Sequence, residues 1–235
     1  MKPVMPLPEE QDHNAPPVNP LPVTVVLLAL AIFGIELVLT AAGAGIIGGP
    51  AGTGWRIAAI ERFAFGAPFL DWMIENRVVR TEFLIRFVTY PFVHGTFTHA
   101  LFALVFLLAI GKFVGEVLAD WAVLLVFVVA SVVGALVYGL AWDTRVPLFG
   151  GYPGAFGLVG AFTFILWSGL AGRAAGLRAF TLIGFLMGIQ LVFGLLYGGA
   201  QDWVANLAGF AAGFALAFVV SPGGWNAIVR RIRQR

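Results

Sequence analysis

Gly150-Gly151-Tyr152-Pro153-Gly154-Ala155-Phe156-Gly157-Leu158-Val159-Gly160-Ala161 is the stretch that decides the fold of this chain. It carries five glycines and one proline, and an apolar run to about Leu170 follows it. Glycine lets neighbouring helix backbones approach closely. Proline fits the first turn of a helix because its missing N–H would have no intrahelical partner there. The stretch therefore predicts a buried central membrane helix with Pro153 at or near its first position.

The composition defines the class of protein. Of the 235 residues, 60% are hydrophobic and 11% are charged, and the mean hydropathy is +0.94. These values are typical of an all-α membrane protein with several spans. The formal net charge of +2 is small and gives no support to a nucleic-acid partner. The chain has no cysteine, which excludes disulfides, thiolate metal sites and a cysteine nucleophile.

Six segments are apolar enough to span a membrane, which takes about 20 residues. They lie at about 23–45, 89–111, 120–141, 153–170, 178–199 and 203–221. The long connection at about 48–86 mixes aromatic and charged residues, which predicts helical pieces along the lipid headgroups; a loop packed on its own protein is the alternative. We expect residues 1–22 to form a disordered proline-rich tail, residues 23–221 the membrane domain, and residues 222–235 a basic tail.

The orientation follows from the lysines and arginines near the ends of the spans, which concentrate on the cytoplasmic side. If the N-terminus is cytoplasmic, the short outer loops carry only Arg145, and the inner side collects Lys2, Lys112, Arg173, Arg178, Arg230, Arg231, Arg233 and Arg235. Five arginines of the long connection then lie outside, although long loops cross with less regard to charge. We expect both tails to be cytoplasmic, in the plasma (inner) membrane of a bacterium.

Small residues recur at helical spacing in the last three predicted spans. Such faces let helices pack closely in membranes. We predict packing positions at Gly154, Gly157, Gly184, Gly188, Gly209 and Gly213.

Three blocks of sequence, in this order, resemble the core of the rhomboid family of intramembrane serine proteases. They are the run RFVTYPFVHGTFTHALFA at 86–103, the stretch at 151–161, and DWVANLAG at 202–209. They fall on the second, fourth and sixth predicted spans, and the resemblance covers roughly residues 86–220. It implies a bundle of six transmembrane helices with a long first loop.

The resemblance also implies which positions would carry the chemistry. The family begins its fourth helix with Gly-x-Ser-Gly, and Pro153 stands at the position of the nucleophilic serine. Asn206 stands at the position of the histidine base on the sixth helix. On the second helix the family has His, four residues, His, three residues, Asn. His94 and His99 match, whereas Ala103 replaces the asparagine, so the positions that help to hold the oxyanion are His99 and Ala103.

Elementary chemistry agrees that these positions cannot catalyse acyl transfer. A hydroxyl nucleophile needs a base within hydrogen-bond reach. Proline has no hydroxyl group, and the amide of Asn206 cannot accept a proton near neutral pH. The chain has three serines, of which Ser131 in the third span could at most approach His99. Two histidines without a nearby carboxylate make a poor metal site. We predict no catalytic residue, no metal and no cofactor.

Three ionisable residues are candidates for a functional role. His94 is either an interfacial histidine that hydrogen-bonds the first loop or a functional one. His99 lies deeper, where an ionisable residue is costly, and we predict a structural hydrogen bond from it to the start of the fourth span. Glu36 lies within the first span, where a carboxyl group must be paired, protonated or turned toward a polar cavity.

The sequence favours a catalytically inactive rhomboid-like protein, a pseudoprotease. We expect its partners to be the lipid bilayer and another membrane protein or its transmembrane helix, with no nucleic acid. One alternative is an active rhomboid-type serine endopeptidase with a rearranged site. A second is a small transporter that uses Glu36, His99 and Asn206 as a polar path, although the spans show no convincing inverted repeat.

Overall fold

The computed structural model describes residues 20–141, 144–169, 177–197 and 202–222, and these residues form helices joined by turns and one isolated β-bridge. The predicted tails, 1–22 and 222–235, lie almost entirely outside the described residues, as does Arg173. The long helices are α1 (Val23–Gly43), α7 (Phe97–Gly115), α8 (Asp120–Ala141), α9 (Tyr152–Gly169), α11 (Thr181–Tyr197) and α12 (Trp203–Val220).

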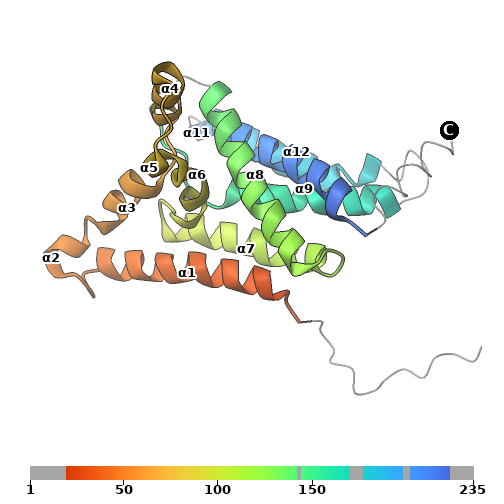
Figure 1. Ribbon diagram of the computed structural model, residues 1–235. Helices are drawn as coiled ribbons and strands as arrows, with labels where there is room; N and C mark the ends of the chain where they lie inside the picture. Colours follow the sequence, from red (N-terminus) through yellow and green to blue (C-terminus); the bar gives the residue numbers. More distant parts are fainter. Residues whose placement is uncertain (1–19, 142–143, 170–176, 198–201, 223–235) are drawn as a thin grey trace, which may run out of the picture.

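The predicted connection at 48–86 is helical in pieces. It contains α2 (Gly49–Gly52), α3 (Trp55–Phe63), α4 (Ala67–Asn76) and α5 (Thr81–Leu84), and it continues into α6 (Arg86–Thr89) and the 3-10 helix η1 (Tyr90–Phe92). We call residues 48–96 loop one. Its helices gather at one end of the long helices (Figure 1).

Four of the described helices, α1, α7, α8 and α12, are long and apolar enough to cross a membrane. The helix α9 has 18 residues and α11 has 17, and neither is among the four. The all-helical membrane fold is therefore confirmed, whereas the predicted count of six spans is not.

The second span begins later than the sequence predicts, at Phe97 instead of about residue 89. Pro91 lies in η1, and Val93 is extended. Thr96 is also extended, and its Oγ1 accepts a hydrogen bond from the His99 N–H at 3.1 Å, which caps α7. This threonine N-cap fixes the start of the helix, so His94 precedes the span.

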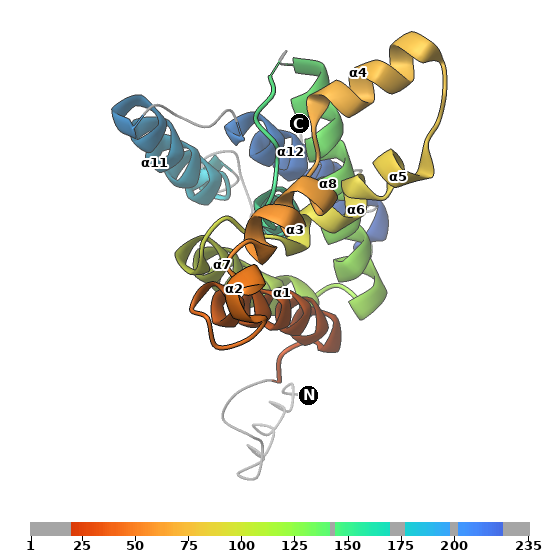
Figure 2. The ribbon, with the colours of Figure 1, turned by 90° about the vertical axis from the view of Figure 1, so that its left-hand side faces the viewer.

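The helix α9 is the centre of the bundle. Residues 153–161 are all buried, because α9 packs against α12, α8 and α7. In Figure 1, α1 and α7 run side by side, α8 crosses them, and α9 and α12 lie together. Figure 2 shows α11 set apart from the other long helices, in keeping with its sparse contacts to α9 and α12.

The closest helix contacts involve the predicted glycines. A Cβ added at Gly213 would overlap the backbone of Gly157, and one at Gly154 would lie 2.6 Å from the Phe127 ring. By contrast, Gly184 and Gly188 are exposed, and an added Cβ would meet no described atom within 4 Å. These two glycines therefore make no close helix contact among the described residues, and their packing role stays a prediction.

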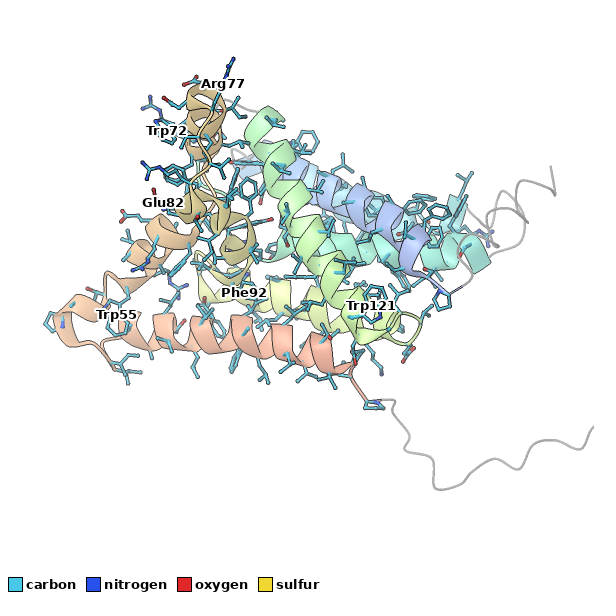
Figure 3. All side chains as sticks on the ribbon, viewed as in Figure 1. Trp55, Trp72, Arg77, Glu82, Phe92 and Trp121 are labelled. Carbon is cyan, nitrogen blue, oxygen red and sulfur yellow. The ribbon has the colours of Figure 1, made fainter. Side chains whose placement is uncertain are left out.

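Exposed tryptophans mark both ends of the bundle. Trp55 and Trp72 lie in loop one, and Trp121 lies at the start of α8 at the opposite end (Figure 3). Tryptophan is enriched where a membrane meets water. The direction between these two groups is therefore the direction in which we expect the chain to cross the bilayer.

Candidate functional site

The candidate site is built around the start of α9. Pro153 is the second residue of α9 and is buried, as a first-turn proline should be. The preceding Gly150 has a φ of 97°, which favours glycine. A Cβ there would also lie 2.9 Å from Cε1 of His99. A glycine turn therefore brings the start of α9 close to the histidines.

His94 fixes this turn from the side of loop one. Its ring is fully buried, and Nε2 accepts a hydrogen bond from the Gly151 N–H at 3.2 Å. Its carbonyl accepts one from Nη1 of Arg56 at 2.8 Å. Burial, with a smaller contribution from the neighbouring His99, lowers the pKa of His94 to about 4. The ring is therefore a neutral acceptor at pH 7. His94 thus contacts both loop one and the start of α9.

His99 meets the start of α9 in a different way from the one predicted. Its ring stacks on Tyr152, with 5.1 Å between ring centroids and 15° between planes. Its carbonyl accepts a hydrogen bond from the Tyr152 hydroxyl at 3.3 Å, and its Nδ1 accepts one from the Gly95 N–H at 3.4 Å. The hydrogen bond of His99 to the start of α9 is thus made by its carbonyl, whereas the side-chain bond to this turn is made by His94, because the bend at 93–96 brings that ring to Gly151.

Glu36 is paired, which decides among the three states considered for it. It is 1% exposed, and Arg56 binds both carboxylate oxygens, Nη2 to Oε1 at 2.7 Å and Nη1 to Oε2 at 2.9 Å. Thr40 donates to Oε1 at 2.8 Å. Arg56 therefore joins α1, α3 and the carbonyl of His94. The pairing of Arg56 with Glu36 was not predicted, although a Trp-Arg pair in an apolar loop is a usable signal.

Three further residues considered from the sequence are Ala103, Asn206 and Ser131. Ala103 and Asn206 are buried, and neither polar atom of the Asn206 side chain has a hydrogen-bond partner among the described residues. Oγ of Ser131 lies 2.7 Å from the place of a Cβ on Gly154 and donates to the Phe127 carbonyl at 2.8 Å. Among the described residues Ser131 makes no hydrogen bond to either histidine.

A cavity of about 400 Å³ opens beside His99, between α7, α9, α11 and the start of α12. Most of its lining is apolar and aromatic, and three polar side chains are included. The lining residues are His99, Phe102, Phe106, Tyr152, Phe156, Leu186, Ile189 and Asp202. Within the described residues, no three His, Cys, Asp or Glu side chains are grouped to hold a metal ion. The lining of the cavity is therefore mostly apolar.

Comparison with known proteins agrees with this architecture. The family model of the Rhomboid domain matches residues 81–223, which is more than half of the chain. The matched region includes His94, His99, Pro153 and Asn206 and extends from loop one to the end of α12. None of the curated proteins compared with the chain matches it.

Proposed function

The chain belongs to the rhomboid family, and from this premise we propose that it is an inactive member, a pseudoprotease that binds transmembrane segments of partner membrane proteins. The observation that carries the proposal is the pair of residues at the two dyad positions, Pro153 on α9 and Asn206 on α12. Proline offers no hydroxyl group for attack on a carbonyl, and an amide is no base at neutral pH.

The surroundings of the dyad positions support inactivity. Ala103 has no side-chain donor where the family has an oxyanion asparagine. The hydroxyl of Ser131 donates to the Phe127 carbonyl of its own helix. A nucleophile needs a base within about 2.6–3.2 Å. The polar groups of this site therefore serve to hold loop one, α7 and α9 together.

The cavity supports the binding of a transmembrane segment. Phe102 of α7 is 56% exposed and Ile189 of α11 is 40% exposed, so the lining is continuous with the surface that faces lipid. Helices in membranes associate by close packing of side chains, and a groove between α7 and α11 offers such a surface. Among the described residues α11 makes few contacts with α9 and α12, which supports α11 as the side of the groove that adjusts to an occupant.

Site-specific crosslinking tests the proposal. A photo-crosslinking amino acid at Ile189 should capture a transmembrane reporter of the kind that active rhomboids cut, and the reporter should remain intact. The matched control is the same amino acid at Leu30 of α1, which is 59% exposed and far from the cavity. Equal capture at both positions would mean random contact in the membrane, and a cut reporter would show that the protein is an enzyme.

We also propose the domain organisation and placement predicted above. Residues 23–221 form a membrane domain in which α9 and α11 are the fourth and fifth of six spans, in the plasma membrane of a bacterium. The family membership and the apolar sequences of α9 and α11 support six spans. The basic and proline-rich tails then both lie in the cytoplasm.

A further inference from the structure

A second cavity, of about 280 Å³, lies between loop one and the segment before α9. Its walls come from the end of α3, the start of α4, Arg86 of α6, and residues 145–147 between α8 and α9. Phe65 and Leu148 exchange two backbone hydrogen bonds, of 2.9 and 2.8 Å, in the β-bridge beside it. Segments distant in sequence are thus held together around one opening.

Arg86 is the fixed charge of this cavity. Its Nη1 donates to the carbonyls of Glu61 and Ala64 at 2.8 and 2.9 Å, and its guanidinium carbon lies 4.5 Å from the centre of the Phe69 ring. Such stacking and bonding hold the planar group in one orientation. Among the described residues Arg86 makes no other hydrogen bond, so the donors of Nη2 remain available.

The charges around the cavity fit a phosphate with an amine beside it. Arg145 also lines the cavity and is exposed. The ion pair between Arg56 and Glu36 lies elsewhere, and no carboxylate of the described residues lies within 4 Å of a charged nitrogen of Arg86 or Arg145. The one acidic residue in the lining is Glu61, and Glu82 on α5 acts on Arg86 from outside it.

The segments that form the cavity also carry exposed apolar side chains outside its lining. They are Ile57 of α3 (64% exposed), Trp72 of α4 (39%) and Val146 of the 145–147 segment (55%). Figure 3 shows Trp72 pointing away from the bundle beside the upper end of α8. A ligand here would have its charged group between the arginines and an apolar body along this surface, which is the build of a membrane lipid.

We propose that this cavity binds the headgroup of an amine-bearing phospholipid, such as phosphatidylethanolamine. Arg86 and Arg145 donate to the phosphate oxygens, since guanidinium groups suit phosphate geometry. Glu61 faces the ammonium group. Because the walls come from α3, α4, α6 and the turn before α9, the bound lipid ties loop one to the bundle.

Native mass spectrometry of the delipidated full-length protein in detergent tests this site. Phosphatidylethanolamine, phosphatidylglycerol, glycerophosphoethanolamine and inorganic phosphate are titrated separately. We expect one molecule of phosphatidylethanolamine to bind per protein, and to bind more tightly than any of the other three compounds. Arg145→Gln should weaken its binding about tenfold or more, the effect of losing a charge-assisted hydrogen bond. Glu61→Gln should remove the preference over phosphatidylglycerol.

The matched control is Arg80→Gln, which removes an exposed arginine of loop one that does not line the cavity and should leave lipid binding unchanged. The lipid site is wrong if Arg145→Gln binds like the parent protein, or if Arg80→Gln weakens binding equally. Inorganic phosphate that binds as tightly as the lipid would identify a free-phosphate site and overturn the lipid assignment.

Discussion

Gly209 of α12 packs directly against the carbonyl group of Pro153 in α9, so closely that a Cβ added at Gly209 would overlap that oxygen. One turn further on, Gly213 stands in the same relation to Gly157. Contacts of this kind require glycine, since any side chain would separate the backbones. The two helices that carry Pro153 and Asn206 are thus held at backbone contact.

Replacement of Gly209 by leucine should therefore destabilise the bundle. Overpacking of a filled interior costs about 1–3 kcal/mol, occasionally more, and here the backbone of Pro153 must move. Thermal unfolding in detergent measures the effect. The control is Ala211→Leu, which adds a similar side chain at an exposed position of the same helix. If both variants unfold at the same temperature, α9 and α12 do not pack as described.

Removal of Arg56 should leave the Glu36 carboxylate buried without an ionic partner. Glu36 is 1% exposed and the Arg56 side chain 21%, and loss of one partner of a buried pair costs up to about 3–5 kcal/mol. We expect Arg56→Leu to lower the unfolding temperature strongly. The double variant Glu36→Leu, Arg56→Leu should recover part of the loss, because no charge then remains buried.

A double-mutant cycle with Glu36→Leu completes this test. The two changes should be strongly non-additive, because each residue is the principal partner of the other. Additive effects would mean that the two side chains do not interact in the folded protein in detergent.

The low pKa of His94 in the folded protein predicts that the fold loses stability in acid. The pKa of its ring falls from the ordinary 6.5 to about 4 on folding, so below pH 6.5 the unfolded chain binds a proton that the folded chain does not. Stability should therefore decrease as the pH falls from about 6.5 to about 4, and this contribution should be constant above that range. The charged or titratable neighbours are His99, Glu36 and Arg56.

The variant His94→Gln isolates this contribution, because glutamine keeps an acceptor for Gly151 and does not titrate. Its unfolding temperature should depend less on pH between 6.5 and 4 than that of the parent. His13→Gln changes a histidine outside the described residues and should leave the parent's dependence intact. An unchanged slope in His94→Gln would show that another group causes the acid sensitivity.

The orientation of the chain is open to a direct test. Reporter fusions at the two ends should both report the cytoplasm, because an even number of spans returns the chain to its starting side. The arginines at 230–235 favour that side for the C-terminal tail. A reporter signal from the opposite side at the C-terminal fusion alone would exclude six spans.

The long helices were predictable because their apolar runs end at polar residues. The third predicted span, 120–141, has the bounds of α8, and the sixth, 203–221, ends one residue beyond α12. The second span was placed too early because Tyr90, Pro91 and Val93 are as apolar as a span. They are buried in loop one instead, and hydropathy alone does not separate a buried apolar turn from a transmembrane helix.

The residues of the site could be predicted from the sequence, whereas most of the contacts between them could not. His94, His99 and Glu36 stand out in an apolar chain because ionisable groups are rare there. The partner of Glu36 was not predicted, since Arg56 reaches it only through the placement of α3 against α1. Likewise, the Gly151 N–H is bonded by the ring of His94 and not by that of His99. This depends on the start of α7 at Phe97, which Thr96 fixes.

The most direct measurement of inactivity is labelling with a fluorophosphonate probe, which reacts with activated serines. The parent protein should not be labelled. Pro153→Ser with Asn206→His should be labelled weakly, and adding Ala103→Asn should improve labelling, because one oxyanion donor is worth about 10²–10³ in rate. Ser131, whose Oγ lies beside Gly154, is the residue to watch. Reproducible labelling of the parent that disappears in Ser131→Ala would contradict the inactive assignment and make Ser131 the nucleophile.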